Sequence, residues 1–555
     1  MRVAFISYGQ ESLGFQYLSA HLKMRGHHVK LFYDPCVFDD KLLLHYPRLN
    51  NVFSFKKWVF KALAEYQPDL VGIAVLTDTF PWAREMARRT KELLPGVRIV
   101  VGGTHVTILP ERVAEEPYFD FLVLGEGEIP MAELTDSLEA RDGRTDIPGV
   151  WFRQDDNSWI KNNFANTIED LAFFGQPDRT IYEPYVNVSK TFMAVSARGC
   201  VYSCSFCHHN ALKKIYEGKG KYLRRLTPEQ FVGYLKEGHE RYKYRTLQIY
   251  DEIFTYDLPW LQKFSDLYRR EINVPHISLG HPNHMSEEVI LALKASNCVG
   301  VQIGVQSLKA ETRTRFLQRN EKDVRVMTMI KDLEKHKLPY QLDMIFGLPG
   351  DVMADYHENA QFFSNCKAAS KINTLILSLQ PQTDIVDHAI EVGMICEADK
   401  ASIDAGEEGC RVGESGSLRD KKQHHMIQNY MLMYRIAVLF PKWITTTMLK
   451  SGIYKYLRYG EPFLGHAVRL YGADQRDILY VHHHVRYAVE WVTRKLFGRS
   501  LWRDQTSSSP ESYRPSAITS SVDCSVGWDQ VDSCAQPTDP LRNSTDSVLS
   551  LPVLR

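Results

Sequence analysis

The stretch Ala197-Arg198-Gly199-Cys200-Val201-Tyr202-Ser203-Cys204-Ser205-Phe206-Cys207 places three cysteines in the spacing C-x3-C-x2-C. Three thiolates can hold three irons of a four-iron, four-sulfur cluster and leave the fourth iron open for a ligand that is not protein. Because an open iron is a reaction site, this segment predicts a [4Fe-4S] cluster with a chemical role.

Zinc is the main alternative ligand for these cysteines. His208 or His209 could complete a Cys3His site, but zinc ligands usually come as two pairs, and no second pair follows nearby. A disulfide is disfavoured because a chain of this length does not need covalent staples. Other cysteines are scattered, and we expect them to be ordinary buried side chains: Cys36, Cys298, Cys366, Cys396 and Cys410.

The segment from Arg198 to Cys207, with the aromatic Phe206 just before the third cysteine, resembles the signature of the radical S-adenosylmethionine (SAM) superfamily. The resemblance implies that Cys200, Cys204 and Cys207 hold the cluster, that SAM chelates the open iron, and that Phe206 lies near adenine. One electron from the cluster then cleaves SAM and releases a 5'-deoxyadenosyl radical, which abstracts hydrogen from the substrate. An electron donor such as flavodoxin or ferredoxin is implied as a partner.

A repeating α/β pattern from about residue 191 to 385 surrounds the motif. Buried strands are predicted at 192–196, 246–250, 276–279, 300–305, 340–346 and 374–379. Amphipathic helices are predicted between them, for example at 287–295 and 324–336. Six such units fit the partial (β/α)6 barrel of the superfamily, and the cysteines follow the first strand, where β/α barrels gather reactive groups.

Polar residues at later strand ends complete the predicted SAM site. Asp251 and Glu252 follow the second strand and resemble the acidic motif by which this family commonly meets SAM. Gly304-Val305-Gln306-Ser307 resembles the family's G-x-[QE]-S, which implies that Gln306 and Ser307 lie near SAM. The turn that begins at Gly347, Gly347-Leu348-Pro349-Gly350, would shape the backbone around the adenosyl group.

Simpler structural roles are open for several of these residues. Asp251 or Glu252 could cap the helix that begins near Leu258, and Ser307 could be an N-cap. His281 and His284 end the third strand and could face substrate or transfer protons, although such histidines are more often hydrogen-bonded structural groups. The run His482-His483-His484 lies in a predicted helix and cannot point all three rings one way.

The first 140 residues alternate short apolar runs with helical segments such as 82–94. Buried strands are predicted at 3–7, 29–33, 70–76, 98–101 and 121–124. This pattern indicates a doubly wound parallel sheet of Rossmann or flavodoxin type, in which ligands bind beyond the carboxyl ends of the strands. Those ends carry Thr77, Gly102-Gly103-Thr104-His105 and Gly125-Glu126-Gly127-Glu128.

Together these strand ends resemble the cobalamin-binding domain that precedes the radical SAM domain in one large class. The resemblance implies that Gly102 and Gly103 let the backbone approach the nucleotide tail and that Thr77 contacts it. The other members of the predicted cobalamin site are His105, Gly125, Glu126 and Gly127. The turn after the first predicted strand lacks G-x-G-x-x-G, which disfavours a dinucleotide site. It also lacks Asp-x-His-x-x-Gly, so no histidine of this turn could bind cobalt from below. A Rossmann-like domain kept for packing or substrate access is the alternative.

Composition divides the rest of the chain. We expect a cobalamin-binding domain at 1–140, a turn-rich connector at 141–190 and the barrel at 191–385. Residues 386–503 indicate a helix-rich C-terminal region, with helices at 426–440 and 478–496. Residues 504–555 are rich in Ser, Thr, Pro and Asp and predict a disordered tail.

The overall composition suits a large enzyme. Of 555 residues 44% are hydrophobic, and Lys plus Arg equals Asp plus Glu at 67 each, so no net charge favours nucleic acid as a partner. No run approaches the roughly 18 apolar residues of a spanning helix, and the N-terminus turns polar too early for a secretory signal. We therefore expect a cytoplasmic protein without a membrane span.

The resemblance also indicates a reaction. Its most common chemistry is cobalamin-dependent methylation of an unactivated carbon, or of phosphorus, on a small molecule in a biosynthetic pathway. One alternative is an oxidative cyclase or rearrangement enzyme similar to the anaerobic magnesium-protoporphyrin cyclase. A non-catalytic iron-sulfur protein is the other, but it would not need a six-unit barrel with polar strand ends.

Overall fold

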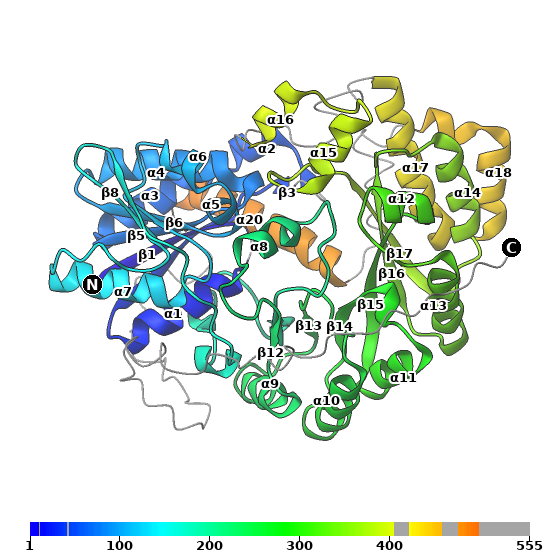
Figure 1. The fold of residues 1–555 in the computed structure, drawn as a ribbon, viewed down its shortest axis with the longest axis horizontal. Helices are drawn as coiled ribbons and strands as arrows, with labels where there is room; N and C mark the ends of the chain where they lie inside the picture. Colours follow the sequence, from blue (N-terminus) through cyan, green and yellow to red (C-terminus); the bar gives the residue numbers. More distant parts are fainter. Residues whose placement is uncertain (10, 41–43, 405–420, 458–474, 499–555) are drawn as a thin grey trace, which may run out of the picture. The chain divides into compact units, whose positions relative to one another are not determined.

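Two large sheets with mainly parallel strands, one from each half of the chain, form the α/β fold (Figure 1). The computed structural model describes all residues except 10, 41–43, 405–420, 458–474 and 499–555. All described residues lie within one unit, Met1–Ser516. The predicted tail at 504–555 and Cys410 lie outside the described residues.

The N-terminal sheet has seven strands in the order β2-β1-β5-β6-β7-β8-β9. The first five are parallel to one another, and this part of the order is that of the flavodoxin type. These strands are continuous apolar runs because helices cover both faces. Their bounds are β1 (Arg2–Tyr8), β2 (His28–Asp34), β5 (Leu70–Ala74), β6 (Arg98–Gly102) and β7 (Phe121–Val123). The predicted fold of this region is confirmed.

Helices form two layers around this sheet. The helices α1 (Leu13–Met24) and α7 (Glu128–Ala140) pack together on one face, and α3 (Lys56–Tyr66) and α4 (Phe80–Leu93) on the other. Each layer has its own buried core, since strand side chains alternate between the two faces. The carboxyl ends of the strands remain for ligands.

The strands β8 (Val150–Arg153) and β9 (Trp159–Lys161) extend the sheet with antiparallel pairing. They belong to the segment expected to be a connector. The polar turn between them, in which Asn157 has a φ of +65°, closes a hairpin rather than linking two domains. The sheet therefore continues beyond the residues assigned to it from the sequence.

The second sheet contains six parallel strands in the order β10-β13-β14-β15-β16-β17. Their bounds are β10 (Phe192–Ala194), β13 (Leu247–Ile249), β14 (His276–Gly280), β15 (Cys298–Gln306), β16 (Tyr340–Phe346) and β17 (Ala369–Ile376). Along the outer side lie α9 (Pro228–Tyr242), α10 (Leu258–Glu271), α11 (Glu287–Ala295) and α13 (Asp323–His336) (Figure 1). The predicted partial barrel is confirmed.

Only the last strand differs clearly from its prediction. It begins at Ala369, five residues before the predicted 374. Lys371 and Asn373 interrupt the apolar pattern there, because alternate residues of this strand do not face the outer helices. The search for an apolar run therefore missed the first half of β17.

The C-terminal region is helical, as expected. The helix α17 (Lys421–Leu439) packs on β17 and on α14 (Met353–Phe363), and α20 (Gln475–Phe497) contributes Tyr487 to the core of the N-terminal domain. In α20, the rings of His483 and His484 contact the segment 35–38, whereas His482 is exposed. This run is packing, not a ligand cluster.

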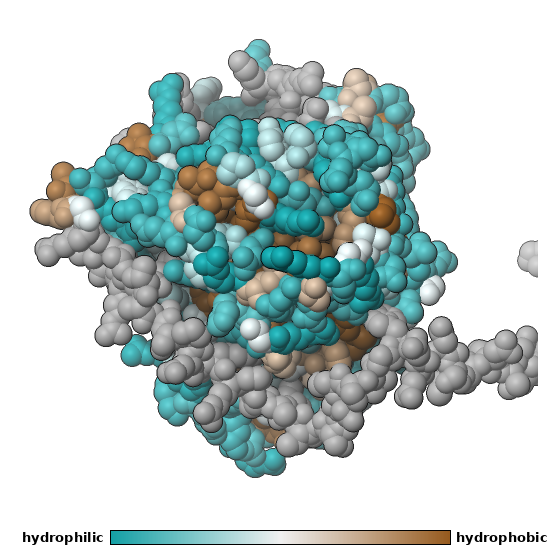
Figure 2. All heavy atoms as spheres, turned by 90° about the vertical axis from the view of Figure 1, so that its left-hand side faces the viewer, coloured by the Kyte–Doolittle hydropathy of each residue, from teal (hydrophilic) through white to brown (hydrophobic). Residues whose placement is uncertain are grey.

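The surface is mainly polar. Figure 2 shows one face on which hydrophilic side chains surround smaller hydrophobic patches. Among the described helices, none has the length and apolar character needed to cross a membrane. Cys36, Cys298 and Cys366 are buried as expected, but Cys396 is exposed, because it precedes the surface helix α16 (Glu397–Asp404).

Candidate functional site

The three cysteines lie in one loop between β11 (Ala197–Arg198) and α8 (His208–Ile215), directly after the first barrel strand. Cys204 is buried, Cys200 and Cys207 are partly buried, and all three are free thiols. A tight turn brings the last two together, since the Cys207 amide donates to the Cys204 carbonyl at 3.0 Å. The loop thus offers three sulfur donors and meets the first requirement of the predicted cluster.

Two features of this loop bear on cluster binding. Burial raises the pKa of all three thiols, that of Cys207 to about 12, so the thiolate forms need a neighbouring positive charge such as iron. Gly199 has a φ of +89°, and a Cβ there would overlap the Tyr222 carbonyl. The chain therefore enters the loop in a conformation that only glycine adopts easily.

The structure does not favour the zinc alternative. His209 Nδ1 bonds to the Tyr222 hydroxyl, and its Nε2 lies 3.2 Å from Glu252 Oε1. Among the described residues, the group whose ligand atoms lie within 4.8 Å of one another consists of His208, His209 and Glu252, without a cysteine. Both histidines thus turn toward Glu252 instead of completing a Cys3His site.

A cavity of about 440 Å³ lies next to this loop. On one side it is lined by the carboxyl ends of β5, β6 and β7 and by the start of α1, and on the other by the residues around β11 and by Tyr250 and Glu252. This volume lies within the usual range of ligand pockets. From the predicted sites it brings together Gly102, Gly103, Gly125, Glu126, Gly127 and Glu252.

Buried ion pairs join the two halves at the cavity wall. The Arg198 guanidinium donates to Glu128 at 2.5 Å and lies 3.5 Å from Glu126, which also accepts two bonds from Arg224. The Arg198 guanidinium also stacks over the Phe174 ring, 4.1 Å from its centroid. The glycine turn of the N-terminal domain is thereby fastened to the residue two positions before Cys200. The sequence analysis did not predict that Arg198 and Glu128 join the two domains. The opposite charges at two predicted cofactor turns could have indicated this ion pair.

The Gly102-Gly103 turn is explained by the fold itself. Gly103 has a φ of +107°, and a Cβ there would lie 2.7 Å from the Val75 carbonyl. At Gly102 a Cβ would lie 3.2 Å from the Val123 carbonyl. The backbone at the end of β6 therefore passes close to the ends of both neighbouring strands. The two glycines also line the cavity.

Thr77 and His105 lie outside the cavity lining. The Thr77 hydroxyl is 3.2 Å from His105 Nδ1, and the buried His105 ring packs against Phe80. Burial lowers the pKa of His105 to about 4, so the ring is neutral at ordinary pH. The pair packs beside the Gly102-Gly103 turn, and the direct contact of Thr77 with the nucleotide tail stays a prediction.

Asp251 and Glu252 point to different environments. Asp251 is buried, and its carboxylate accepts bonds from the Ser196 amide and hydroxyl and from the Ala197 amide. It supports the segment that leads into the cysteine loop. Neither residue caps the following helix, because Asp257 occupies that N-cap. Glu252 faces the cavity.

The remaining predicted SAM residues lie at the ends of β15 and β16. Gln306 and Ser307 line a second cavity of about 200 Å³, and the Gln306 Oε1 atom is buried without a hydrogen-bond partner. Ser307 is not the N-cap of the next helix, a position taken by Lys309, although its hydroxyl accepts from the Lys309 amide. Gly347 turns with a φ of +75°, and Phe206 packs partly buried against the barrel core.

A polar row crosses three barrel strands, a feature that the sequence analysis missed. Gln302 donates to both Asp343 carboxylate oxygens at 2.9 Å, and Asn373 donates to Asp343 at 2.7 Å. These half-buried side chains alternate with buried apolar residues that face the outer helices. The row therefore lies on the inner face of the barrel, and its signal in the sequence is a polar residue inside each of three otherwise largely apolar strands.

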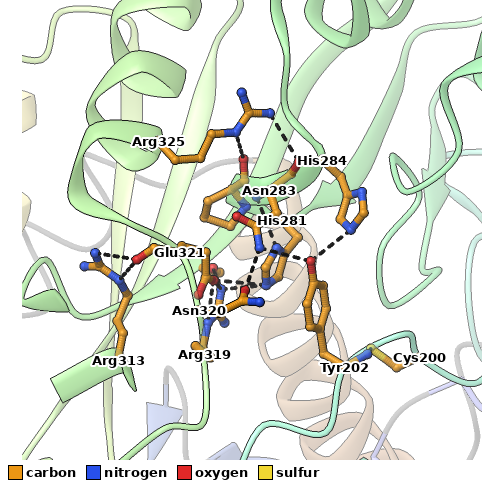
Figure 3. A network of polar contacts seen from close by, with 12 residues as sticks. Cys200, Tyr202, His281, Asn283, His284, Arg313, Arg319, Asn320, Glu321 and Arg325 are labelled. Carbon is orange, nitrogen blue, oxygen red and sulfur yellow. Dashed lines mark hydrogen bonds and ion pairs between the residues drawn. The ribbon is translucent and has the colours of Figure 1, made fainter. Parts of the chain in front are cut away.

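His281 and His284 form part of a packed polar network around Tyr202 of the cysteine loop (Figure 3). The rings of Tyr202 and His281 stack, with their centroids 4.0 Å apart. These contacts agree with the structural alternative raised for the two histidines.

Comparison with known proteins identifies both halves of the chain. Residues 3–135 match the B12-binding domain family, and residues 195–363 match the radical SAM superfamily. An uncharacterized methyltransferase of Pyrococcus horikoshii is 24% identical over 311 residues, which cover 55% of this chain and 66% of that protein. The anaerobic magnesium-protoporphyrin IX monomethyl ester cyclase of Cereibacter sphaeroides is 34% identical over 157 residues, 26% of this chain and 25% of that protein.

The fold has a solved counterpart. The radical SAM methyltransferase TsrM from Kitasatospora setae, determined with cobalamin and a [4Fe-4S] cluster, aligns with a TM-score of 0.55 and 17% identity. The alignment covers 71% of this chain and 76% of that one. Since the chain spans just under two thirds of the first curated relative and a quarter of the second, these matches establish the domains and the fold. The chain therefore carries an N-terminal B12-binding domain followed by a radical SAM domain.

Proposed function

We propose that this protein is a cobalamin-dependent radical SAM methyltransferase that acts on an unactivated carbon of a small molecule. The observation that carries the proposal is the cavity, because the glycine turns of the B12-binding domain and the entrance to the cysteine loop line the same space. A shared space is what a reaction that uses both cofactors requires. The methyltransferase names of the Pyrococcus protein and of TsrM support the same reading.

The residues present suit both cofactors. Cys200, Cys204 and Cys207 would hold the cluster, and the turns at Gly102-Gly103 and Gly125-Glu126-Gly127 would hold cobalamin. When bound, the cluster would supply the electron that cleaves SAM, and cobalamin would supply a methyl carrier. Gln306, Ser307, Gly347 and Phe206 would contact SAM from the barrel, and Asp251 would act by supporting the cysteine loop.

The chain's own side chains would position the substrate. Glu252 faces the cavity and lies beside His209, so it can accept a hydrogen bond or a proton from a bound molecule. The polar row of Gln302, Asp343 and Asn373 lines the inner barrel face and offers directed hydrogen bonds. The apolar part of the cavity wall would exclude water from the radical chemistry.

One observation favours a second function. Over 157 residues the chain is more similar to the cyclase of Cereibacter sphaeroides, at 34%, than to the Pyrococcus methyltransferase over its longer alignment. An oxidative cyclase would use the same cluster and radical without transferring a methyl group. The two functions therefore predict different products from SAM.

We also propose the setting in which the enzyme works. The cluster needs a one-electron donor of low potential, for which flavodoxin or ferredoxin is the candidate, and a cytoplasmic location would protect it from oxygen. We further propose the domain bounds 1–140, 191–385 and 386–503, with the hairpin of β8 and β9 added to the N-terminal sheet.

Anaerobic reconstitution tests the proposal. The protein is supplied with iron, sulfide, cobalamin, SAM and a reductant, and 5'-deoxyadenosine and S-adenosylhomocysteine are measured together with the corrin absorbance of the repurified protein. Both products with bound corrin support methyl transfer, because methyl donation by SAM leaves S-adenosylhomocysteine. 5'-Deoxyadenosine alone would favour the cyclase, and neither product would reject both functions.

A further inference from the structure

Tyr202 lies between the first two cysteines, and its side chain leaves the cysteine loop to contact the barrel. Its ring stacks on His281, with a centroid distance of 4.0 Å and an interplanar angle of 16° (Figure 3). Its hydroxyl accepts a bond from Asn283 Nδ2 at 3.2 Å and lies 3.0 Å from His284 Nε2. Tyr202 is thus held by stacking and by two directed bonds.

His281 is a firm support for this ring. Its Nδ1 accepts from the Asn283 amide at 3.3 Å, and its Nε2 lies 3.1 Å from Glu321 Oε1. Burial lowers the pKa of His281 to about 4, which keeps the ring neutral. Both histidine nitrogens are therefore engaged, and the ring cannot rotate without breaking a bond.

The support extends to the neighbouring strand. The Arg319 guanidinium pairs with Glu321, approaches His281 Nε2 at 2.9 Å and donates to the Gly304 carbonyl in β15 at 2.7 Å. The side chains of Arg319 and Glu321 are almost fully buried, at 3% and 0% exposed. A buried and mutually compensated pair of this kind makes a rigid anchor, because separating the charges is costly.

The turn that carries the histidines is fixed as well. Arg325 donates to the carbonyls of Pro282 and Asn283 at 3.1 and 3.2 Å, and Asn283 Nδ2 also donates to Asn320 at 2.9 Å. Figure 3 shows these side chains converging on the turn from two segments of the barrel. Tyr202 therefore connects the cysteine loop to a site with little freedom to move.

The connection reaches a cluster ligand through the main chain. The Tyr202 amide donates a hydrogen bond to Cys200 Sγ, at 3.5 Å. Hydrogen bonds to cluster sulfurs raise the reduction potential, because they stabilise the additional negative charge of the reduced state. The position of Tyr202 thus controls both the loop shape and one hydrogen bond to a ligand sulfur.

We propose that Tyr202 is a positioning residue for the iron-sulfur cluster: its contacts with His281, Asn283 and His284 hold the cysteine loop in shape and maintain the N–H···S bond to Cys200. This inference rests on the proposed assignment of the three cysteines to the cluster. It assigns Tyr202 no contact with substrate. Loss of the anchor makes the cluster easier to remove and shifts its midpoint potential to more negative values.

The test compares three variants after anaerobic reconstitution. Tyr202→Leu removes the ring and both bonds, Tyr202→Phe keeps the stacking, and Tyr242→Leu removes a tyrosine of α9 that bonds to Glu183 on the outer side of the barrel. The rate of iron loss to a chelator and the midpoint potential, followed by electron paramagnetic resonance, are measured for each. We expect about tenfold faster iron loss and a negative shift for Tyr202→Leu, a smaller effect for Tyr202→Phe, and no shift for Tyr242→Leu.

The outcomes separate this inference from the proposed function. If the unaltered protein takes up no cluster, the cysteine assignment itself fails. If it does, and Tyr202→Leu matches its potential and rate of iron loss, Tyr202 has no positioning role. Should Tyr202→Leu not fold, His281→Leu removes the stacking partner and leaves the sequence of the cysteine loop unaltered, and the same two measurements decide.

Discussion

At the scale of single residues, chemical type matters less than where the fold has placed each group. Cys204 and Cys298 are both buried free thiols, yet one lies in the loop after β10 and the other in strand β15. Asp251 and Glu252 are neighbours, yet one supports the backbone and the other faces a cavity. Substitutions at such matched positions separate function from packing.

Cys204→Ala should abolish cluster binding and the formation of 5'-deoxyadenosine, because two thiolates cannot hold the cluster in an open-iron site. Cys298→Ala is the matched control, since it also removes a buried sulfur from the barrel. Iron content and 5'-deoxyadenosine are measured after reconstitution. SAM cleavage by Cys204→Ala at the unaltered rate would refute the cluster assignment.

A second prediction at this scale concerns pH. Burial raises the pKa of Asp351 to about 6, while bonds from the Leu348 amide and the Tyr356 hydroxyl oppose the rise. A raised carboxyl pKa contributes stability below the unfolded value near 4, and this contribution is lost as the pH rises through 6. Asp351→Asn should lack this pH dependence. The melting temperature of the variant minus that of the unaltered protein should therefore increase as the pH rises from about 4 to about 6.

The control for this experiment is Asp387→Asn, which changes an exposed carboxylate that pairs with Lys400. Melting temperatures are measured for the cluster-free chain at several pH values. A constant difference between Asp351→Asn and the unaltered protein across the range would contradict the raised pKa.

At the scale of elements, the antiparallel pair of β11 and β12 (Arg224–Arg225) acts together with the Gly125–Glu128 turn. Arg198 and Arg224 from these two strands pair with Glu126 and Glu128, and the Glu128 side chain is only 7% exposed. A buried ion pair adds little net stability over apolar packing, but loss of one partner leaves an uncompensated charge. These contacts are therefore expected to set geometry between the two cofactor regions.

Arg198→Met should destabilise the cluster-free chain by about 3–5 kcal/mol, because Glu128 would remain charged and buried. The double variant Arg198→Met with Glu128→Leu should lose less than the sum of the two single variants, since it leaves no orphaned charge. Urea unfolding measures each free energy, with Arg88→Met, from an exposed pair with Glu92, as the control expected to cost about 0–1 kcal/mol. Additive effects would mean that the two side chains do not interact.

At the scale of the whole molecule, the two domains divide the chemistry. The cysteine loop and the polar strand ends belong to the barrel, whereas the glycine turns belong to the N-terminal sheet. Buried Arg179 also joins them, since it bonds to Glu11 of the first domain and to Tyr234 of the barrel helix α9. We therefore expect each cofactor to bind when the other is absent.

Protein reconstituted without cobalamin should still cleave SAM to 5'-deoxyadenosine but should form no S-adenosylhomocysteine. The barrel holds every residue assigned to the cluster, and the methyl carrier would be missing. Both products are quantified by chromatography, with the cobalamin-loaded protein as the reference. S-adenosylhomocysteine at the same level without cobalamin would show that methyl transfer does not use the B12-binding domain.

The sequence alone determined the features that depend on local patterns. Continuous apolar runs predicted the strands of both sheets, because a strand buried on both faces needs no polar alternation, and the cysteine spacing predicted a cluster loop. The same logic missed the start of β17 and the hairpin of β8 and β9, whose polar residues resemble those of a loop. Glycine turns marked the correct strand ends, although the fold explains Gly103 without any ligand.

Only the tertiary structure decided which distant residues meet. Glu128 and Arg198 are 70 positions apart, and Tyr202 and His281 are 79 apart, and no local pattern encodes either contact. The tertiary structure also decided that Asp251 and Glu252 have different environments, since the direction of a side chain at a strand end depends on the neighbouring strands. The spacing of residues that are close in sequence can be read from the sequence. Burial, pairing of charges and the shared cavity arise only when the two sheets pack together.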